Sequence, residues 1–551
     1  MRPSIHKIAL CICLCTIFSH AFSQNWNWSN QNGSTNYDGA ADIVVDNSGN
    51  CYYTGSFSGQ VCYFTNDTSG ICQGDNDLYI IKYDANGNEV WFRQLGANNI
   101  GGTCSEGIGS VTIDADNNVY VAGSFCDYIT IGNTNLTGRG SEIFITKLDT
   151  SGRFIWAKKA GGNGIDEAGG IAADGIGNLY ICGLNSSTAF FETDSIPAGG
   201  FIAKYDTSGA LVWVKNRFRY WHSGSVNAEI IPTDIKVYNS NLLICGTSFN
   251  DTLIVDTITR FTQVTYSNSC AMAFDTSGNI KWLDVFGGGN STVGYDFTID
   301  NSGNMFIAGA FNYPGYFGHD TLSSSNLGDV YVAKIDINGA MQWVRQINAS
   351  NGGWGLSSST DQSDGSTYFT GYFEGSASFG TYNLTASSSR DMFLTRYDTY
   401  GNCLGVRNFG YAEGHGVAQD LNGSPYVCGM FRGTIHIGSN TFSNYGQTDV
   451  FVAKCDVFTS IDEEKHLANN QLIIYANPNS GKCNLKVPDE FLNERKLLLS
   501  IFDNSGKLLQ QKHLEGGNDK IDLNLETYSK GVYTVALSNG RNIYRGKIVF
   551  E

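Results

Sequence analysis

The stretch Asp46-Asn-Ser-Gly-Asn-Cys-Tyr-Tyr-Thr-Gly55-Ser-Phe57 decides the fold, because versions of it recur along the chain. It joins an Asp-x-x-Gly turn to a short run rich in aromatic and small residues, which is typical of a β-strand. Its second glycine returns with a period of roughly 60 residues. The copies end at Gly55, Gly123, Gly183, Gly246, Gly309, Gly371 and Gly429. The chain therefore contains seven units of one repeat.

A second motif follows each copy of the first. In the first unit it reads Asp77-Leu-Tyr-Ile-Ile-Lys-Tyr-Asp84-Ala-Asn-Gly87-Asn-Glu-Val-Trp91. The Trp returns at Trp156, Trp213, Trp282 and Trp343, and is missing from the copies at Asp398 and Asp456. In both motifs Asp accepts backbone N–H bonds and Gly takes a positive φ, so strands one and two, and strands three and four, form hairpins. Four strands in each of seven units predict an all-β, seven-bladed β-propeller.

The ends of the repeat region predict how the ring closes. The last unit lacks its Trp strand, whereas the stretch Trp26-Asn-Trp28-Ser-Asn-Gln31-Asn-Gly33 matches the fourth strand that begins at Trp91. A last blade without its fourth strand would leave an open sheet edge. We therefore expect residues near Trp28 to pair with the strand at 450–454.

The composition agrees with this fold and excludes several classes of function. Among 551 residues there are 66 Gly and 7 Pro, and the chain is 13% aromatic and 16% charged. This balance is typical of strands joined by tight turns rather than of a helical bundle. The net charge of −17 opposes binding to nucleic acid or anionic lipid. No stretch approaches the ~20 apolar residues of a membrane-spanning helix.

The first 23 residues have the pattern of a secretory signal peptide. Arg2 and Lys7 precede an apolar run at 8–18, and Ala21-Phe22-Ser23 offers a cleavage site between small residues. Export would place the remaining cysteines in an oxidising compartment, where disulfides form. The candidate bridges are Cys62 with Cys72 and Cys104 with Cys126. The cysteines expected to be small buried core residues are Cys182, Cys245 and Cys428.

The repeats resemble those of secreted bacterial seven-bladed propellers of the SBBP type, over roughly residues 24–458. They depart from two propeller signatures that belong to enzymes. Quinoprotein repeats are one residue longer between Asp and Gly than Asp84 to Gly87, and sialidase Asp boxes place the aromatic residue three positions after Gly, whereas Trp91 stands four after Gly87. The resemblance therefore implies a seven-bladed propeller fold that carries neither of these two enzyme signatures.

A polar linker at 459–470 precedes a smaller C-terminal module at 471–551, whose alternating strands predict a small β-sandwich. The module resembles the type A C-terminal sorting domain of the type IX secretion system. The matching positions include Asn477, Pro478, Gly481, Gly506, Lys507, Gly531, Val532, Tyr533 and Lys547. The resemblance implies export across an outer membrane by the type IX machinery, with the mature part attached to the cell surface or released. The alternative is a generic adhesive sandwich domain.

The longest connection between units contains a basic and aromatic cluster that is rare in this acidic chain. Long loops gather on one face of a propeller, and binding residues favour that face. Aromatic rings stack on sugars and Arg pairs with carboxylates, so the cluster suits a sugar or an acidic polymer. The alternative is that its aromatic residues pack between blades. The candidate ligand-binding residues are Arg217, Arg219, Tyr220, Trp221, His222 and, expected in another such loop, Trp354.

Acidic residues recur shortly before the first strand of several units. In a propeller they would approach the mouth of the central channel, where a ring of carboxylates suits a cation or a cationic ligand. The alternative is that these carboxylates accept hydrogen bonds from loop backbone amides. The candidate channel-mouth residues are Asp38, Glu106, Asp166, Glu167 and Glu413.

Motifs of catalysis and of metal binding are missing from the sequence. It contains no Gly-x-Ser-x-Gly, His-Glu-x-x-His or phosphate-binding glycine loop, no Cys/His cluster at zinc spacing, and only 8 His. We therefore predict no catalytic residue, no metal and no cofactor. The pattern favours a non-enzymatic module that binds an extracellular glycan, protein or polymer. The alternative is a propeller that hydrolyses or cleaves an extracellular polysaccharide.

Overall fold

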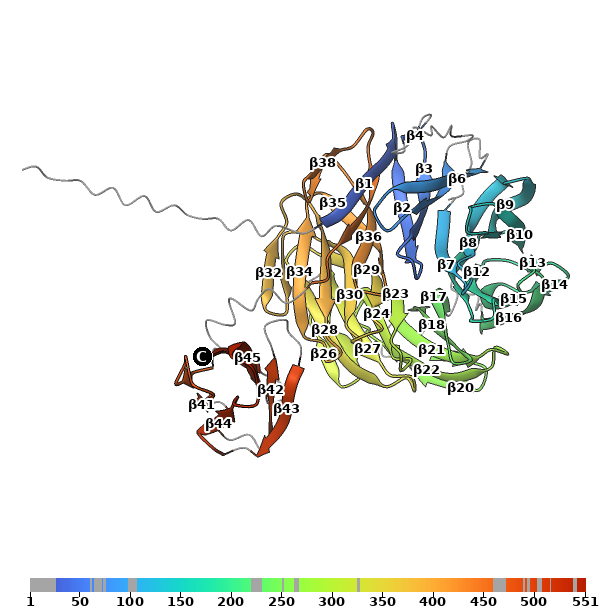
Figure 1. Cartoon of the computed structure of the whole chain (residues 1–551). Coiled ribbons are helices and arrows are strands. Elements are labelled where there is room, and N and C mark those ends of the chain that lie inside the picture. The colour runs from blue at the N-terminus through green and yellow to red at the C-terminus, as the bar shows by residue number, and fades with distance from the viewer. Residues whose placement is uncertain are drawn as a thin grey trace, which may run out of the picture. The chain divides into compact units, whose positions relative to one another are not determined.

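The computed structural model consists of β-strands joined by turns and loops (Figure 1). It describes residues 26–59, 62–63, 72, 76–97, 107–219, 230–249, 252–261, 267–324, 328–458, 472–488, 491–492, 496–502, 508–515, 517–538 and 543–551. The predicted signal peptide at 1–23 and linker at 459–470 lie outside these residues. The chain divides into two compact units, Met1–Val457 and Phe458–Glu551.

The first unit consists of seven four-stranded antiparallel blades. The innermost strands are β2 (Asp38–Val45), β7 (Gly107–Ile113), β11 (Asp166–Ala173), β17 (Ile230–Tyr238), β23 (Ser291–Ile299), β29 (Gly353–Thr360) and β35 (Ala412–Gln419). The second strands are β3 (Cys51–Phe57), β8 (Val119–Ile131), β12 (Leu179–Asn185), β18 (Asn241–Ser248), β24 (Met305–Asn312), β30 (Thr367–Phe373) and β36 (Pro425–Phe431). The third strands are β5 (Asp77–Tyr83), β9 (Thr134–Leu148), β15 (Gly199–Tyr205), β21 (Asn268–Asp275), β27 (Asp329–Ile335), β33 (Asp391–Tyr397) and β39 (Asp449–Cys455). The fourth strands are β6 (Glu89–Ala97), β10 (Phe154–Gly162), β16 (Leu211–Arg219), β22 (Ile280–Phe286), β28 (Met341–Ala349), β34 (Cys403–Phe409) and β1 (Trp26–Ser34).

The innermost strands contact one another in a closed ring, from β2 through β7, β11, β17, β23 and β29 to β35 and back to β2. The hydrophobic core is divided among the spaces between neighbouring blades. In the space between the last blade and the first, for example, Val452 and Tyr426 pack with Ile43 and Tyr53. The predicted all-β propeller fold is confirmed by this arrangement.

The two repeat motifs have the predicted structural roles. In the first turn, Gly49 has a φ of 78° and the Asp46 carboxylate accepts hydrogen bonds from the Ser48 and Asn50 amides, both at 2.9 Å. The repeat Trp locks adjacent blades together. The Trp91 indole donates to the Thr150 carbonyl of the next blade at 3.2 Å, and Gly152 in that turn has no room for a Cβ because the Trp91 ring lies against it.

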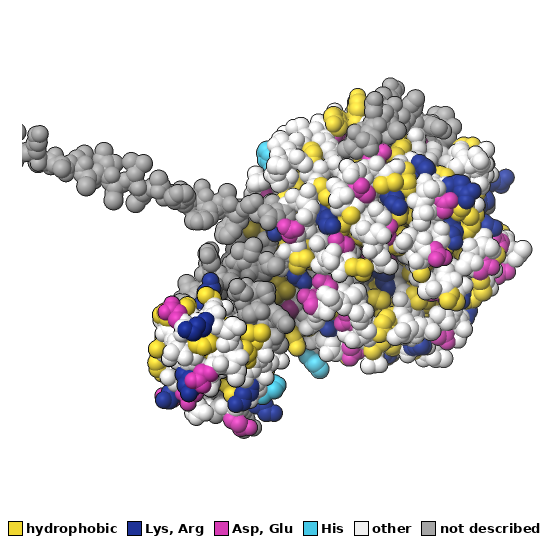
Figure 2. Space-filling model, viewed as in Figure 1, with side chains coloured by type: hydrophobic (Ala, Val, Ile, Leu, Met, Phe, Trp, Pro, Cys, Tyr) yellow, Lys and Arg dark blue, Asp and Glu magenta, His cyan; other side chains and the backbone are white. Residues whose placement is uncertain are grey.

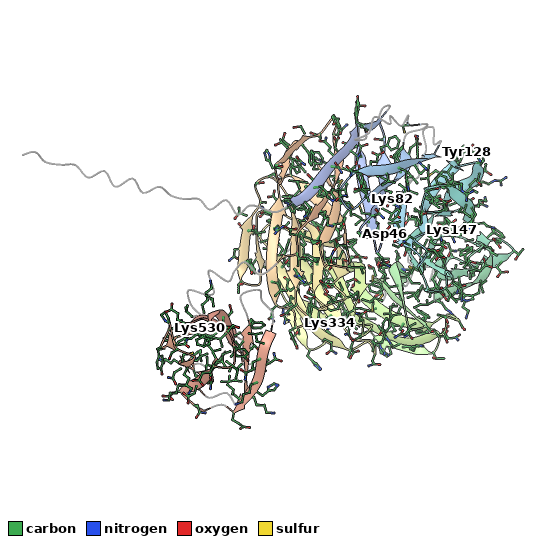
Figure 3. The ribbon with its side chains drawn as sticks, viewed as in Figure 1. Asp46, Lys82, Tyr128, Lys147, Lys334 and Lys530 are labelled. Atoms are coloured by element: carbon green, nitrogen blue, oxygen red, sulfur yellow. The ribbon has the colours of Figure 1, made fainter. Side chains whose placement is uncertain are left out.

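A basic residue of the third strand lies over an aromatic ring of the second strand in most blades. Lys82 and Lys147, labelled in Figure 3, occupy equivalent positions in the first two blades. Their ammonium groups lie 4.9 Å from the ring centroids of Tyr52 and Tyr120, respectively. These repeated cation–π contacts tie the second and third strands together beside the turn Asp.

The ring closes as predicted. The N-terminal strand β1, blue in Figure 1, lies among the orange strands of the last blade and pairs antiparallel with β39, with Trp28 opposite Lys454. Trp28 donates to the Ala85 carbonyl at 3.0 Å, as a fourth-strand Trp should. Gln31 donates to the Asp449 carboxylate at 2.6 Å, matching the contact of Gln346 with Asp329 in another blade.

Most second-to-third connections form an extra hairpin or strand. These elements are β4 (Cys62–Tyr63), β13 (Ala189–Phe191), β14 (Asp194–Ile196), β19 (Thr252–Val255), β20 (Ile258–Phe261), β25 (Gly315–Phe317), β26 (Asp320–Leu322), β31 (Ser376–Phe379), β32 (Tyr382–Thr385), β37 (Thr434–Ile437) and β38 (Asn440–Ser443). Several pair with the fourth strand of the preceding blade, as β13 does with β10. They cover part of that strand's free edge.

The cysteines largely follow the sequence expectations. Cys182, Cys245 and Cys428 are free and fully buried. Cys126 is disulfide-bonded, and its predicted partner Cys104 lies outside the described residues. Cys72 carries no disulfide bond, and its thiol contacts the Phe57 carbonyl at 3.8 Å, so the predicted bridge between Cys62 and Cys72 is wrong.

The C-terminal unit has two sheets that share one hydrophobic core. Its strands are β40 (Ile474–Tyr475), β41 (Lys482–Lys486), β42 (Lys496–Phe502), β43 (Leu508–Glu515), β44 (Lys520–Asn524), β45 (Gly531–Ser538) and β46 (Ile543–Phe550). The Asn477 side chain donates to the Lys547 carbonyl at 2.6 Å and accepts from the Val549 amide at 2.7 Å. Two segments of the sorting motif thus meet, which gives Asn477 a structural role. Gly506 and Lys507 lie outside the described residues.

Candidate functional site

The candidate site begins at a β-bulge that every innermost strand carries. In β29, for example, Gly355 lies opposite Gly371 and Ser357 lies opposite Thr370, so Leu356 is the extra residue. The bulge pushes a first-strand carbonyl toward the repeat glycine of the second strand. A Cβ on Gly371 would lie 1.9 Å from the Trp354 oxygen. The repeat glycines therefore exist because no side chain fits opposite the bulge.

The bulges line a cavity of about 100 Å³ on the propeller axis. All seven innermost strands contribute to its wall. The lining residues are Ala41, Asp42, Gly109, Ser110, Gly169, Thr233, Asp234, Tyr295, Asp296, Leu356, Ser357 and His415.

Three carboxylates and one ammonium gather in this channel. Lys236 lies 2.8 Å from the Asp234 carboxylate, and Asp296 shares a hydrogen bond with Asp234. Burial, and then the charge of Asp234, raises the pKa of Asp296 well above its usual value. Burial also raises the pKa of Asp42. Burial alone would lower the pKa of Lys236, but these three carboxylates raise it.

Two of the channel carboxylates also accept backbone hydrogen bonds from the next blade. Asp42 accepts from the Val111 amide at 3.0 Å, and Asp296 accepts from the Ser358 amide at 2.6 Å. The innermost strands are edge strands whose amides lack a strand partner on the channel side, so these bonds satisfy them. The channel acids therefore have a structural role in addition to their charge.

An aromatic and charged group of residues lies where the innermost strands begin, at the end of the channel that faces the long loops. The Trp354 and Tyr372 rings are stacked with centroids 5.2 Å apart, and the Arg390 guanidinium lies 4.6 Å from the Tyr372 centroid. Arg390 pairs with Glu413 at 2.5 Å and with Glu374 at 3.2 Å. We call these five residues the mouth group.

The surroundings of the mouth group favour the ionised form of Glu413 and the neutral form of Tyr372. Burial alone would raise the pKa of Glu413, but the nearby His415 ring and a hydrogen bond from Arg390 lower it below its usual value. Burial raises the pKa of Tyr372 to about 12. Burial raises the pKa of Tyr295 in the channel, and a hydrogen bond with Trp354 offsets part of this rise.

The predicted channel-mouth acids do not form one ring. Asp38 is buried and accepts from the Ser34 amide and hydroxyl at 2.5 and 2.6 Å, and buried Asp166 accepts from the Gly162 amide at 2.6 Å. Glu413 and the exposed Glu167 are the second residues of their strands, whereas Asp38 and Asp166 are the first. Their side chains therefore point to the opposite face of the sheet. Glu106 lies outside the described residues.

The predicted basic and aromatic cluster is only partly described. Arg217 pairs with Asp256 at 2.7 Å, so its charge is already compensated. The side chains of Arg219, Tyr220, Trp221 and His222 lie outside the described residues. Trp354 lies in strand β29 rather than in a loop, because the chain there continues the alternation of the innermost strand.

The sequence reasoning missed Asp42, Asp234, Lys236, Asp296, Tyr372 and Arg390. The available signal was an Asp directly before a buried apolar residue in the middle of an innermost strand, as in Asp42-Ile43, Asp234-Ile235 and Asp296-Phe297. In the other blades this position holds Ser or Gly, so self-comparison does not reveal a motif.

Among the described residues, no group of three or more His, Cys, Asp or Glu side chains is placed to hold a metal ion. The lysine and backbone contacts of the channel carboxylates occupy oxygens that a cation would need.

Comparison with known proteins gives distant relatives for the repeats. The chain is 23% identical over 507 residues to the uncharacterized WD repeat-containing protein L264 of Acanthamoeba polyphaga mimivirus, covering 74% of this chain and 36% of that protein. It is 24% identical over 291 residues to the regulatory protein FlaEY of Caulobacter vibrioides, covering 46% of this chain and 30% of that protein. The chain thus spans about a third of the length of these curated relatives.

Solved structures with similar folds have low sequence identity. The Dos1 propeller is 9% identical with a TM-score of 0.38, and the match covers 78% of this chain and 95% of that one. A member of the DUF4221 family from Bacteroides vulgatus is 8% identical with a TM-score of 0.28, and the match covers 78% of this chain and 98% of that one.

The C-terminal module gives a specific match. Residues 473–551 match the family of secretion system C-terminal sorting domains. In the part of the chain that the structure describes, no helix is long and apolar enough to cross a membrane. The chain therefore combines a β-propeller with a C-terminal sorting domain of the type IX secretion system, and is exported to the outer cell surface or the medium.

Proposed function

We propose that the exported propeller is a non-enzymatic module that binds an extracellular glycan at the mouth group. The observation that carries this proposal is the half-buried Trp354–Tyr372 stack, held on two paired strands beside the channel. Aromatic rings of this kind supply a rigid apolar surface for the faces of sugar rings. Placement on strands rather than loops fixes their geometry before any ligand arrives.

The charges favour a neutral glycan over an acidic one. Arg390, the cation of the mouth group, is neutralised by two carboxylates, and Lys236 in the channel faces three. Acidic and basic side chains are interspersed on the face seen in Figure 2, and the whole chain carries −17. Both described cations of the mouth group and the channel are thus paired with carboxylates, so a polyuronate gains little from them, whereas hydroxyl groups find both donors and acceptors.

The alternative, a polysaccharide hydrolase or lyase, is favoured by one observation. Asp234 and Asp296 share a hydrogen bond in the channel, and paired carboxyl groups can divide acid and base roles. Against it, Asp234 is tied to Lys236, and Asp296 to the backbone of the next blade.

A single experiment separates the two. Residues 24–551 are applied to immobilised neutral glucans, xylans and mannans, amino-sugar polymers and polyuronates, and new reducing ends are measured in parallel. We expect binding to neutral polysaccharides without product, and loss of binding in Trp354→Ala and Tyr372→Ala. Tyr400→Ala is the matched control, because Tyr400 is 74% exposed in a third-to-fourth strand turn, on the face away from the long loops.

Release of product by the wild type, abolished in Asp296→Asn, would replace the binding proposal by the hydrolase. Binding that survives both aromatic substitutions would move the site away from the mouth group.

A further inference from the structure

Three exposed tyrosines lie on chain segments that meet where the propeller ring closes. Tyr37 is 53% exposed, Tyr63 is 45% exposed and Tyr445 is 54% exposed. The rings of Tyr63 and Tyr445 contact each other with centroids 4.9 Å apart. The three come from three segments, namely the start of the first blade, its second-to-third connection, and the same connection of the last blade. We call these residues the seam platform.

The backbone beneath the platform is tightly held. The Tyr37 carbonyl accepts from the Ser58 amide and hydroxyl at 3.1 and 2.8 Å, and its amide donates back to that hydroxyl at 3.1 Å. Tyr37 also bridges to Thr448, and Tyr63 pairs with Gly33 in β1. The platform is therefore exposed without being loose, which keeps the entropy cost of binding low.

Glycines let the three segments approach this closely. A Cβ on Gly59 would lie 2.5 Å from the Ser34 hydroxyl, and one on Gly446 would lie 2.5 Å from the Asn36 backbone. Each is therefore a point where one segment rests on another. The arrangement exists only when β1 occupies the last blade.

Among the described residues, the exposed polar side chains beside the platform carry no charge. Asp38 and Asp449 are buried and accept hydrogen bonds from backbone amides, including the Tyr445 amide at 3.0 Å. The neighbouring polar side chains are the amides Asn36 and Gln447. Exposed phenol rings edged by amides suit a neutral polyhydroxyl chain, since rings cover the apolar sugar faces and amides bond the hydroxyls.

The platform and the mouth group lie at the same end of the propeller. Tyr37 directly precedes β2 and Trp354 is the second residue of β29, and all innermost strands begin at that end. Between them, in the last blade, Tyr411 directly precedes β35 and carries the Arg432 guanidinium 5.9 Å from its ring centroid. The described aromatic residues thus extend over the sixth, seventh and first blades.

We propose that the seam platform is a second subsite, and that the ligand is a linear neutral polysaccharide long enough to contact both the mouth group and the seam platform. This inference rests on the glycan-binding function proposed above. Two weak contacts on one chain raise its affinity, because the second contact becomes intramolecular. Short oligosaccharides reach one subsite alone.

The test uses residues 24–551 and size-graded oligosaccharides of neutral β-glucan and xylan, from disaccharide to decasaccharide, measured by titration calorimetry. We expect the longest fragments to bind at least about tenfold more tightly than the tetrasaccharide. The variant Tyr63→Ala/Tyr445→Ala should lose this gain while keeping the wild-type affinity for the tetrasaccharide. Tyr400→Ala should keep both, and an unchanged melting temperature checks that the seam stays closed.

Three outcomes separate this inference from the function on which it rests. Equal affinity for short and long fragments, or a length gain that survives in the double variant, overturns the second subsite and leaves glycan binding intact. If the wild-type protein binds neither oligosaccharide series and none of the immobilised polysaccharides that test the proposed function, both the second subsite and glycan binding are overturned. Loss of the length gain in the double variant alone supports the second subsite.

Discussion

Buried carboxylates in this propeller hold backbone amides that the sheets leave unpaired. Asp38 holds the loop before the first blade, Asp166 holds the loop before the third, and Asp42 reaches across to the second blade. An acidic residue near a channel mouth is therefore weak evidence for a ligand. The residues left for binding are those whose rings stay accessible after the backbone is satisfied.

Asp38 should make stability fall as the pH rises. Burial raises its pKa from 3.8 to about 7, so the folded chain binds a proton that the unfolded chain has released. Its contribution to stability is complete below the unfolded pKa and is lost as the pH rises through the folded pKa, at up to ~1.4 kcal/mol per pH unit. Urea unfolding of Asp38→Asn between about pH 4 and pH 7 should show a flatter dependence than the wild type.

Asp149→Asn is the matched control for Asp38. Hydrogen bonding from Ser151 lowers the pKa of this exposed carboxyl to about 2. It is therefore ionised in both the folded and the unfolded state above about pH 5, and Asp149→Asn should leave the slope between about pH 5 and pH 7 unchanged. An identical slope in Asp38→Asn and wild type would contradict the proposed titration.

Lys236 should stabilise the channel by compensating its carboxylates. Removing it in Lys236→Met leaves Asp234, Asp296 and Asp42 without a counter-charge, which destabilises a buried cluster. We expect a lower melting temperature at neutral pH, and a smaller loss in acid as the carboxylates take up protons. Lys236→Met/Asp234→Asn should recover part of the loss. If the double variant melts no higher than the single one, the charge argument fails.

At the scale of elements, one glycine in each second strand permits one bulge in each first strand. Gly371→Ala would place a Cβ 1.9 Å from the Trp354 carbonyl, so β29 has to shift. Overpacking of this kind costs roughly 1–3 kcal/mol or more, and here it also displaces the ring of Trp354. We expect both a lower unfolding midpoint and weaker glycan binding.

Gly107→Ala is the control for that substitution. Gly107 lies in the innermost strand of the second blade, and a Cβ there meets nothing within 4 Å. It should therefore leave stability and binding close to wild type. A similar loss in both variants would mean that glycine flexibility, rather than space opposite the bulge, sets the cost.

The turns and the fourth strands could be predicted from the sequence, because the residues that define them are close together along the chain. Asp46 and Gly49 make their turn with neighbours along the chain, and a Trp at a fixed distance from the preceding turn marks most fourth strands, so self-comparison found both. Asp42, Asp234 and Asp296 come together only through the closed ring, and the other blades hold Ser or Gly at the same position. Successive residues of a strand also point to opposite faces of the sheet, so an offset of one position separated Glu413 from Asp38.

At the scale of the molecule, closure depends on a contact between the two ends of the repeat region. Trp28 and Gln31 matched the fourth-strand pattern, so the pairing of β1 with β39 was predictable from sequence. The seam platform was not, because Tyr37, Tyr63 and Tyr445 share no motif and meet only after closure.

Deleting residues 26–34 should open the ring. Without β1 the last blade lacks its fourth strand, β39 presents a free edge, and the contact of Trp28 with the turn at Ala85 is lost. We expect a lower melting temperature and a broader transition. A synthetic peptide of residues 26–36 should restore both in a concentration-dependent way, because it adds the missing strand to the exposed edge.

The same peptide with Trp28→Ala and Gln31→Ala should not restore stability, because it keeps the backbone pairing but loses the indole bond to the next blade and the amide bond to Asp449. Equal rescue by both peptides would show that strand pairing alone closes the ring. A deletion that melts like the wild type would mean that blade packing holds the propeller without its closing strand. If rescue by the natural peptide also restores the affinity gain for long oligosaccharides, then closure of the ring builds the seam platform.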